Sequence, residues 1–432
     1  MSERNRSIRQ LFAMAALIAA GEGIFLLPFV VPRVFRPTLL DVFGLSNLQL
    51  GSAFSLYGLV AMGSYLAGGP LADRFSARRL MTIALLATAA GGLAMAQVPA
   101  LGQLIAIYAF WGMTTILLFW AALIRATREW GSASTQGRAY GILDGGRGLL
   151  AAVIASLTLA IFGSLLPADL EQATLAERAA ALKGAILVVT AITASIAALI
   201  WFALPQRSAA QRRASSAERL SLTGLKRALG MPTIWWLSLI VICAYCGYKT
   251  TDDFSLFARD AFGYDDVAAA GVGTLVFWMR PLGAVAGGLL ADRLGGWKVV
   301  AASFVLSLLS SALIGSGVIG GPALWTALVV AVSLANYALR GVYFALCEQA
   351  RVPLSITGSA VGLISLVGFT PDVFMGPLMG WLLDRSPGLR GHQQLFTTLA
   401  GFSALGLLAA VAFGRCAAPK RYGQAKSPTN SR

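Results

Sequence analysis

Long apolar runs alternate with short polar segments along the whole chain. A helix that crosses a bilayer needs about 20 apolar residues, and scanning on that criterion predicts twelve such spans. The first six are residues 10–32, 48–70, 80–97, 101–123, 139–166 and 183–204. The second six are residues 234–257, 267–290, 299–318, 322–346, 355–383 and 393–414. The pattern therefore predicts an all-α integral membrane protein.

Composition excludes the common soluble classes. Hydrophobic residues make up 57% of the 432 residues and charged residues only 12%, whereas soluble proteins contain roughly 25% charged residues. So few charges cannot cover the surface of a soluble protein of this size. The net charge is +15, but Lys and Arg gather in the short segments between apolar runs, as membrane topology requires. We therefore expect a surrounding lipid bilayer and no nucleic-acid partner, and we expect a monomer.

The distribution of Lys and Arg orients the spans. With both termini on one side, that side carries about three times as many basic residues as the other. Both termini and the central loop are thus predicted to be cytoplasmic, and Arg33 and Arg36 to lie in a loop on the opposite side. No obvious cleavage site follows the short basic N-terminus, so the first helix is expected to be retained. These features are typical of a multi-pass protein in a bacterial-type inner membrane.

One break in composition divides the chain. Residues 206–231 are polar, basic and rich in Ser and Ala, which predicts a cytoplasmic linker. The linker separates an N-terminal six-helix bundle, residues 1–205, from a C-terminal six-helix bundle, residues 232–416. The last residues, 417–432, are predicted to be a disordered tail.

An internal repeat supports this division. GGPLADRFSARR follows the second span and GGLLADRLGGWK follows the eighth, so that Asp73 and Asp292 lie about 220 residues apart. GRAYGILDGGRG and GSAVGLISLVGF, which open the fifth and eleventh spans, are separated by nearly the same distance. Two matches at one offset predict a duplicated six-helix unit, an arrangement found in transporters.

The repeated loop motif has the form G-x-x-x-D-R/K-x-G-x-R/K-R/K. Its first copy consists of Gly69, Asp73, Arg74, Ser76, Arg78 and Arg79, with Ser in place of the second glycine. Its second copy consists of Gly288, Asp292, Arg293, Gly295 and Lys298. With this motif, twelve spans and a long middle loop, the chain resembles the major facilitator superfamily of secondary transporters over essentially its whole length. The resemblance implies two pseudo-symmetric bundles that rock about a central site.

The acidic and basic residues of this motif are candidates for a conformational gate. Asp73 and Asp292 can accept charge-assisted hydrogen bonds or face a helix N-terminus at the cytoplasmic mouth. Together with Arg74 and Arg293, they would stabilise the outward-open state and release in the inward-open state. The alternative is that the arginines only anchor the loops to anionic lipid headgroups.

Several ionisable residues fall inside predicted spans, where each costs about 2.5–3.5 kcal/mol on insertion scales. Arg280 and Arg340 have no acidic residue within four positions, so we expect unpaired guanidinium groups that face a cavity and bind a carboxylate or phosphate. The alternative is pairing across helices with acids such as Glu22. The full set of predicted substrate-binding residues is Arg280, Arg340, Arg147, Lys249, Tyr140, Tyr248 and Trp278.

Three acids are candidates for proton coupling. Glu22 lies in the middle of the first span, where desolvation favours its protonated form. Asp252 and Asp253 lie beside Lys249 in a polar stretch that interrupts the seventh span. A permanent counter-ion role is the alternative for Glu22, and local ion pairing with Lys249 is the alternative for the two aspartates.

These features predict a secondary transporter of a small, carboxylate-like organic anion, working by proton coupling or exchange. The alternative is proton-coupled efflux of cationic or amphiphilic drugs. However, the glycine-rich fifth span lacks the proline that drug exporters of the major facilitator superfamily usually carry there. A membrane enzyme or a receptor derived from a transporter fold is less well supported. We expect no catalytic residues, metal or cofactor, because one His and a Cys243–Cys246 pair inside an apolar run do not indicate a metal or redox site.

Overall fold

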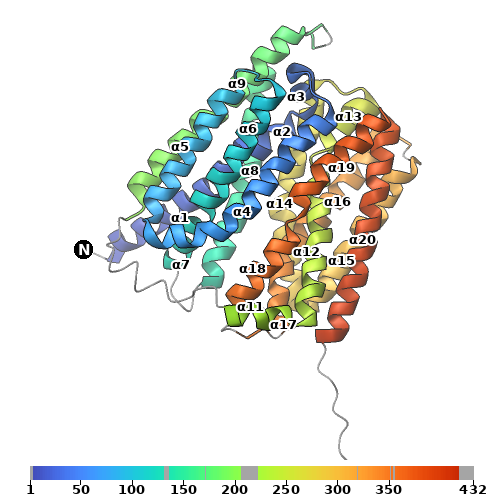
Figure 1. The fold of residues 1–432 in the computed structure, drawn as a ribbon. Helices are drawn as coiled ribbons and strands as arrows, with labels where there is room; N and C mark the ends of the chain where they lie inside the picture. Colours follow the sequence, from blue (N-terminus) through green and yellow to red (C-terminus); the bar gives the residue numbers. More distant parts are fainter. Residues whose placement is uncertain are drawn as a thin grey trace, which may run out of the picture.

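The computed structural model describes residues 3–130, 136–170, 172–205, 222–318, 320–350, 352–353 and 356–417. Across these ranges the regular structure is entirely helical. Figure 1 shows two helical bundles side by side, the first coloured blue to green and the second yellow-green to red. The all-α membrane architecture predicted from the apolar pattern is therefore confirmed.

The first bundle begins with a helix in three consecutive segments: α1 (Glu3–Phe25), the π-helical η1 (Leu26–Val30) and α2 (Val31–Val34). It continues with α3 (Arg36–Phe43), α4 (Asn47–Arg74), α5 (Ala77–Met95), α6 (Leu101–Gly112), η2 (Met113–Trp120), α7 (Ala121–Trp130), α8 (Gln136–Leu165) and α9 (Leu175–Ala203). The short helix α3 was not expected. Arg33 and Arg36 were expected in a loop, but Arg33 lies in α2, Arg36 begins α3, and both side chains are buried.

The second bundle consists of α12 (Pro232–Thr250), α13 (Phe254–Phe262), α14 (Asp266–Leu294), α15 (Gly296–Ser316), α16 (Pro322–Val342), η3 (Tyr343–Ala345), α17 (Leu346–Gln349), α18 (Thr357–Gly368), α19 (Pro371–Arg385) and α20 (Leu389–Ala417). The predicted linker contributes α11 (Leu222–Leu229), whereas residues 206–221 and the predicted tail from residue 418 onward lie outside the described residues. The seventh span breaks at the polar stretch, because α12 ends at Thr250 and α13 begins at Phe254.

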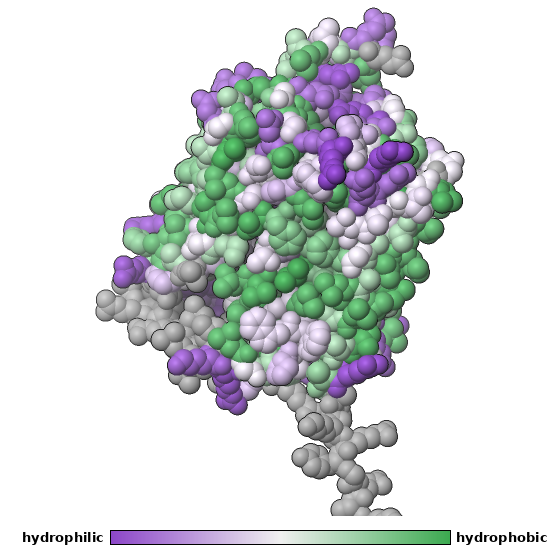
Figure 2. All heavy atoms as spheres, turned by 45° about the vertical axis from the view of Figure 1, so that its right-hand side comes forward, coloured by the Kyte–Doolittle hydropathy of each residue, from purple (hydrophilic) through white to green (hydrophobic). Residues whose placement is uncertain are grey.

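Every predicted span coincides with a helix or with consecutive helical segments. Among the described residues, nine helices are long and apolar enough to cross a membrane. The helices α4, α5 and α12 occupy the positions of the other three predicted spans. On the face shown in Figure 2, hydrophobic side chains cover the middle of the molecule and hydrophilic residues are concentrated towards both ends.

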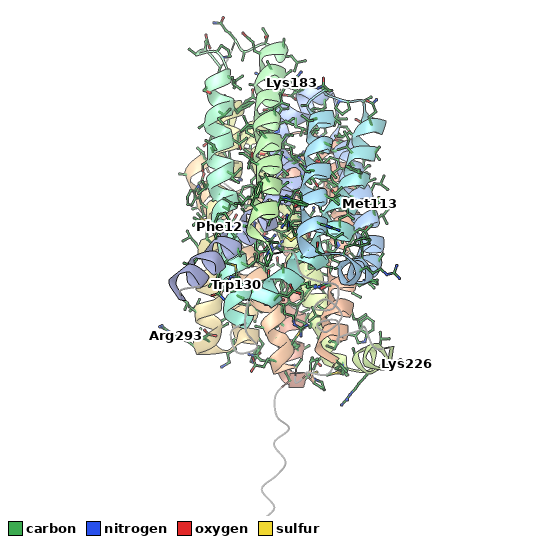
Figure 3. The ribbon with its side chains drawn as sticks, turned by 90° about the vertical axis from the view of Figure 1, so that its left-hand side faces the viewer. Phe12, Met113, Trp130, Lys183, Lys226 and Arg293 are labelled. Atoms are coloured by element: carbon green, nitrogen blue, oxygen red, sulfur yellow. The ribbon has the colours of Figure 1, made fainter. Side chains whose placement is uncertain are left out.

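The molecule has an inner end and an outer end, which are defined by the residues that they carry. The inner end carries Arg293 and Lys226, and the outer end carries Lys183 at the start of α9 (Figure 3). Charge distribution predicts that the inner end is cytoplasmic. The helices α3 and α13 lie at the outer end, and α11 and α17 lie at the inner end (Figure 1).

Close helix packing joins the bundles towards the outer end. The helices α4 and α19 pack along each other, as do α8 and α14. A Cβ added at Gly51 of α4 would lie 2.2 Å from the carbonyl oxygen of Gly376 in α19, and one at Gly380 would lie 2.4 Å from Leu48. Only glycine allows the two backbones to approach this closely.

Candidate substrate site

Nine ionisable residues from both bundles form a central charged cluster. Its members are Glu22, Arg33, Asp144, Arg147, Lys249, Asp252, Arg280, Arg340 and Asp372, which interact through ion pairs and shared aromatic neighbours. Burying a charge is costly unless it is paired, so the contacts within this cluster decide what it can bind.

Glu22 of α1 is the centre of the part nearer the inner end. Its Oε1 accepts a hydrogen bond from Nη1 of Arg280 at 2.9 Å, and its Oε2 lies 3.3 Å from Nε of Arg147. Arg147 also lies 3.5 Å from the largely exposed carboxylate of Asp144. The expectation that Arg280 is unpaired is therefore wrong, because an acid from the other bundle satisfies it. Glu22 serves here as the counter-ion of two arginines.

The part nearer the outer end combines two further carboxylates with two cations. Arg33 of α2 contacts Asp252 at 2.5 Å and donates a hydrogen bond to the Tyr248 hydroxyl at 3.2 Å. Lys249 lies 3.3 Å from Asp372 and 3.9 Å from Asp252. The local contact between Lys249 and Asp252 and the pairing of Lys249 with Asp372 across helices both correspond to alternatives that the sequence left open.

Arg340 of α16 differs from the other cations of the cluster. Its guanidinium lies over the ring of Tyr248, 3.8 Å from the centroid, and 5.6 Å from the centroid of Tyr245. Its Nη1 is buried without a hydrogen-bond partner. Within the described part of the chain, no carboxylate lies within ion-pair distance of it. The prediction of a guanidinium without an acidic partner thus holds for Arg340.

Aromatic side chains hold the cluster together. Tyr245 donates its hydroxyl hydrogen to Asp372, with both carboxylate oxygens 3.1 Å away. Phe29 of η1 and Phe54 of α4 bring their ring centroids to 4.9 Å and 5.5 Å from Nζ of Lys249. These rings belong to the first bundle and Lys249 belongs to the second, so the contacts cross the interface between the bundles. A π-helical segment such as η1 frequently marks a functional site.

Two predicted aromatic residues lie outside this arrangement. Tyr140 donates to the carbonyl oxygen of Ile124 at 3.1 Å, a contact between α8 and α7 within the first bundle. Trp278 is exposed in the same stripe of α14 as Leu282, Val285 and Leu289, and it donates to Ser156 of α8. Neither of these hydrogen bonds reaches the cluster, and a role of the two residues in substrate binding stays a prediction.

The third proton-coupling candidate, Asp253, also lies apart from the cluster. It turns towards His392 of α20, with Oδ2 2.7 Å from Nδ1 of the imidazole. Only Glu22 and Asp252, of the three acids, contact the cluster's cations. Each of them neutralises an arginine of the other bundle.

The predicted gate residues lie at the inner end. Arg74 ends α4, and both Asp292 and Arg293 are exposed near the end of α14. The side chain of Asp73 lies outside the described residues. The motif therefore occupies the loops that the resemblance implies, and its role as a gate stays a prediction.

At the outer end, polar contacts connect the bundles. Arg259 of α13 lies 2.8 Å from Asp41 of α3, and Arg178 of α9 lies 3.1 Å from Asp266 of α14. The carboxylate of Asp384 accepts hydrogen bonds from the first two backbone amides of α4, those of Asn47 and Leu48. These contacts close the outer end of the interface between the bundles.

Sequence reasoning underestimated three residues of the site. Arg33 lies beyond the apolar window of the first span, so it was assigned to a loop. Asp372 was considered only as a possible counter-ion of the buried cations, and Tyr245 only as one of the aromatic residues of the spans. The available signal was the pair of prolines near Arg33, Pro32 and Pro37, because proline at the first turn of a helix is compatible with the short helices α2 and α3 found here.

The sequence profile of the Major Facilitator Superfamily matches residues 11–371. The chain is 27% identical over 418 residues to inner membrane protein YqcE of Escherichia coli strain K12, with 95% of each chain covered. It is 25% identical to inner membrane protein YihN of the same strain, over 93% of this chain and 94% of that protein.

Two solved structures show the same fold. A bacterial homologue of the human lysosomal transporter Spinster, inward-facing and unoccupied, superposes with a TM-score of 0.71 at 14% identity, covering 97% of this chain and 100% of that chain. The nucleoside transporter NupG superposes with a TM-score of 0.69 at 16% identity, covering 94% and 98%. Because the profile spans most of its length, the chain belongs to the Major Facilitator Superfamily and is a multi-pass membrane protein of the secondary-transporter type.

Proposed function

We propose that this transporter carries a small organic anion with a carboxylate-like group, by alternating access and without catalytic activity. The observation that carries the proposal is Arg340, whose buried Nη1 lacks a hydrogen-bond partner beside the ring of Tyr248. A guanidinium donates in a fork that matches a carboxylate or a phosphate oxygen pair. A bound anion would supply the missing acceptor.

The charge balance of the cluster supports an anionic substrate. Five cations, namely Arg33, Arg147, Lys249, Arg280 and Arg340, face four carboxylates, namely Glu22, Asp144, Asp252 and Asp372. One of those carboxylates, Asp144, is largely exposed and pairs with Arg147 only at 3.5 Å. The buried part of the cluster therefore has an excess of positive charge, which an anion would neutralise.

The same contacts argue against a cationic drug as the substrate. Glu22, Asp252 and Asp372 each pair with an arginine or a lysine. A cationic ligand would have to displace one of these buried partners and leave it uncompensated. Efflux of cationic or amphiphilic drugs is for this reason the weaker alternative.

The position of the cluster supports transport by rocking of the bundles. Arg33–Asp252 and Glu22–Arg280 each join one bundle to the other, so both pairs must rearrange when the interface opens. A substrate anion that competes for Arg280 or Arg340 would couple binding to that rearrangement. We further propose that the protein works as a monomer, with both termini cytoplasmic, by proton coupling or anion exchange.

Ligand-dependent stabilisation tests the substrate class. Purified protein is screened by thermal unfolding against carboxylates, phosphate esters and cationic dyes, and we expect stabilisation by a subset of the anions. Arg340→Gln removes hydrogen bonds to a charged group, worth about 1.5–3 kcal/mol, so that stabilisation should largely disappear. Arg415→Gln, at an exposed arginine of α20, is the matched control and should retain it.

Transport of the best anion is then measured in proteoliposomes as counterflow. Uptake that Arg340→Gln abolishes and Arg415→Gln preserves would support the proposal. Stabilisation by cationic compounds alone, unchanged in Arg340→Gln, would overturn it in favour of cation efflux.

A further inference from the structure

A second group of buried ionisable residues lies at the outer end of the second bundle. His392 is the only histidine of the chain and is fully buried in the first turn of α20. Its Nδ1 lies 2.7 Å from Oδ2 of Asp253, and its Nε2 lies 3.2 Å from Oδ2 of Asp260. Asp253 is also fully buried, whereas the side chain of Asp260 is 26% exposed.

The hydrogen-bond chemistry of this triad requires an additional proton. A neutral imidazole has one N–H donor and one acceptor nitrogen, and an ionised carboxylate only accepts. With a neutral imidazole and two ionised carboxylates, only one of the two contacts can be a hydrogen bond. Both contacts can be hydrogen bonds only if the triad binds one further proton. The simplest arrangement is an imidazolium that donates to both Asp253 and Asp260.

We propose that His392, Asp253 and Asp260 form a proton-binding site, and that the proton held there stabilises closure of the outer end. Asp253 was expected to carry a proton, but the histidine and Asp260 were not. The inference rests on the proposed alternating access, because closure of the outer end is a step of that cycle. It does not depend on the identity of the substrate.

The charged surroundings of His392 are confined to a few elements. Arg259 of α13 lies 3.3 Å from Asp260 and also contacts Asp41 of the first bundle. Burial raises the pKa of Asp260, but hydrogen bonds from His392 and Arg259 and their charges lower it below its usual value overall. Lys249 of α12 is directed to Asp372 and Asp252, and Asp384 of α19 to the start of α4. The outer ends of α15 and α16, residues 305–316 and 322–330, contain no ionisable residue.

Helix α13 connects the triad to the interface between the bundles. Asp253 immediately precedes α13, next to Asp252, which pairs with Arg33. Ser255 donates to the carbonyl oxygen of Arg33 at 3.0 Å, and Arg259 further along the helix pairs with Asp41. The helix that carries Asp260, with Asp253 at its N-cap, therefore also makes the contacts that close the outer end.

Loss of the proton would weaken that closure. A neutral imidazole turns an acceptor nitrogen towards one carboxylate, so that one of its two contacts becomes repulsive. The repulsion separates α13 from α20 and so strains the contacts of α13 with α2 and α3. The proton would leave through Asp260, because it is the one member of the triad that reaches solvent.

The single histidine makes the protonation state directly measurable. Protein labelled with ¹⁵N-histidine and purified through a tag without histidine gives the imidazole signals of His392 alone. We expect both ring nitrogens to be protonated at neutral pH in the absence of any substrate. In Asp260→Asn and in Asp253→Asn we expect a neutral tautomer under the same conditions. A neutral imidazole in the unaltered protein would overturn the proposal.

A second measurement tests the link to closure. Spin labels at Ala168 and Val318, exposed at the outer end of the first and second bundles, report the separation of the bundles. Raising the pH should shift the distances towards longer values over the range in which His392 loses its proton. His392→Gln should abolish that shift, whereas Gln394→Ala, at an exposed position of the same helix, should retain it.

Each outcome decides one part of the proposal. If His392 is an imidazolium and its deprotonation leaves the distances between the spin labels unchanged, the link to closure is refuted. The link is also refuted if the distances in His392→Gln respond to pH as they do in the unaltered protein. Because neither measurement uses a substrate, failure of the proposed anion specificity cannot be mistaken for failure here. Asp260→Asn provides a second test of the link if His392→Gln does not fold.

Discussion

Arg33 and Asp252 form a buried ion pair between the two bundles, with Nε and Nη2 of Arg33 both 2.5 Å from Oδ1 of Asp252. The residues are 219 positions apart in the chain. The Tyr248 hydroxyl accepts a further hydrogen bond from Arg33, so the pair connects the interface to the ring over which Arg340 lies.

Removing one partner of this pair should be costly. Asp252→Asn leaves the Arg33 charge buried and uncompensated, and we expect a loss of about 3–5 kcal/mol in stability, measured by thermal or denaturant unfolding. The double variant Arg33→Met with Asp252→Leu removes both charges and should recover most of that loss. A double variant as unstable as Asp252→Asn would show that the charges themselves are not the cause.

Replacing Glu22 separates a counter-ion from a proton carrier. Glu22→Gln leaves Arg147 and Arg280 without their shared carboxylate, so we expect reduced thermal stability and a greater affinity for anions. Both effects are measured in the ligand screen on purified protein. Unaltered stability, with loss of proton-driven uptake alone, would instead identify Glu22 as the coupling residue.

The contact between α4 and α19 should not tolerate a methyl group at Gly51. In Gly51→Ala the added Cβ meets the backbone of Gly376, so we expect a longer distance between spin labels at Ala168 and Val318, or a lower unfolding temperature. Gly63→Ala is the matched control, because no atom lies within 4 Å of its added Cβ and it lies in the same helix. It should be neutral, or stabilising by about 0.5–1 kcal/mol.

Two substitutions of Tyr248 distinguish its ring from its hydroxyl. Tyr248→Phe keeps the surface over which Arg340 lies and loses the hydrogen bond from Arg33. Tyr248→Leu also loses the cation–π contact, worth roughly 0.5–2 kcal/mol. If the ring positions Arg340 for an anion, binding titrations should show a larger loss of affinity in Tyr248→Leu. Equal losses would assign the effect to the hydroxyl.

The ion pair between Asp41 and Arg259 is partly exposed and should contribute little to stability. We expect Asp41→Asn to change the free energy of unfolding by no more than about 1 kcal/mol. The same variant should nevertheless lengthen the distances between the labels at the outer end, and more so at low ionic strength, where the intact pair is strongest. A large change in stability would place this pair among the structural contacts of the fold.

The amino-acid sequence by itself determined the class of protein, the positions of the spans and the division into two repeated halves. These properties depend on local features: the length of apolar helix that a bilayer requires, and motifs that recur along the chain. The break at Lys249–Asp253 and the absence of an acidic neighbour near Arg340 were predictable for the same reason.

Only the tertiary structure decided which buried charges are compensated. Glu22 and Arg280 are 258 positions apart, and His392 and Asp253 are 139 apart, so no local pattern could pair them. Arg280 and Arg340 look alike in the sequence, yet one meets a carboxylate from the opposite bundle and the other lies over a tyrosine ring. The difference arises because packing of the two bundles brings Glu22 to Arg280 and no described carboxylate to Arg340.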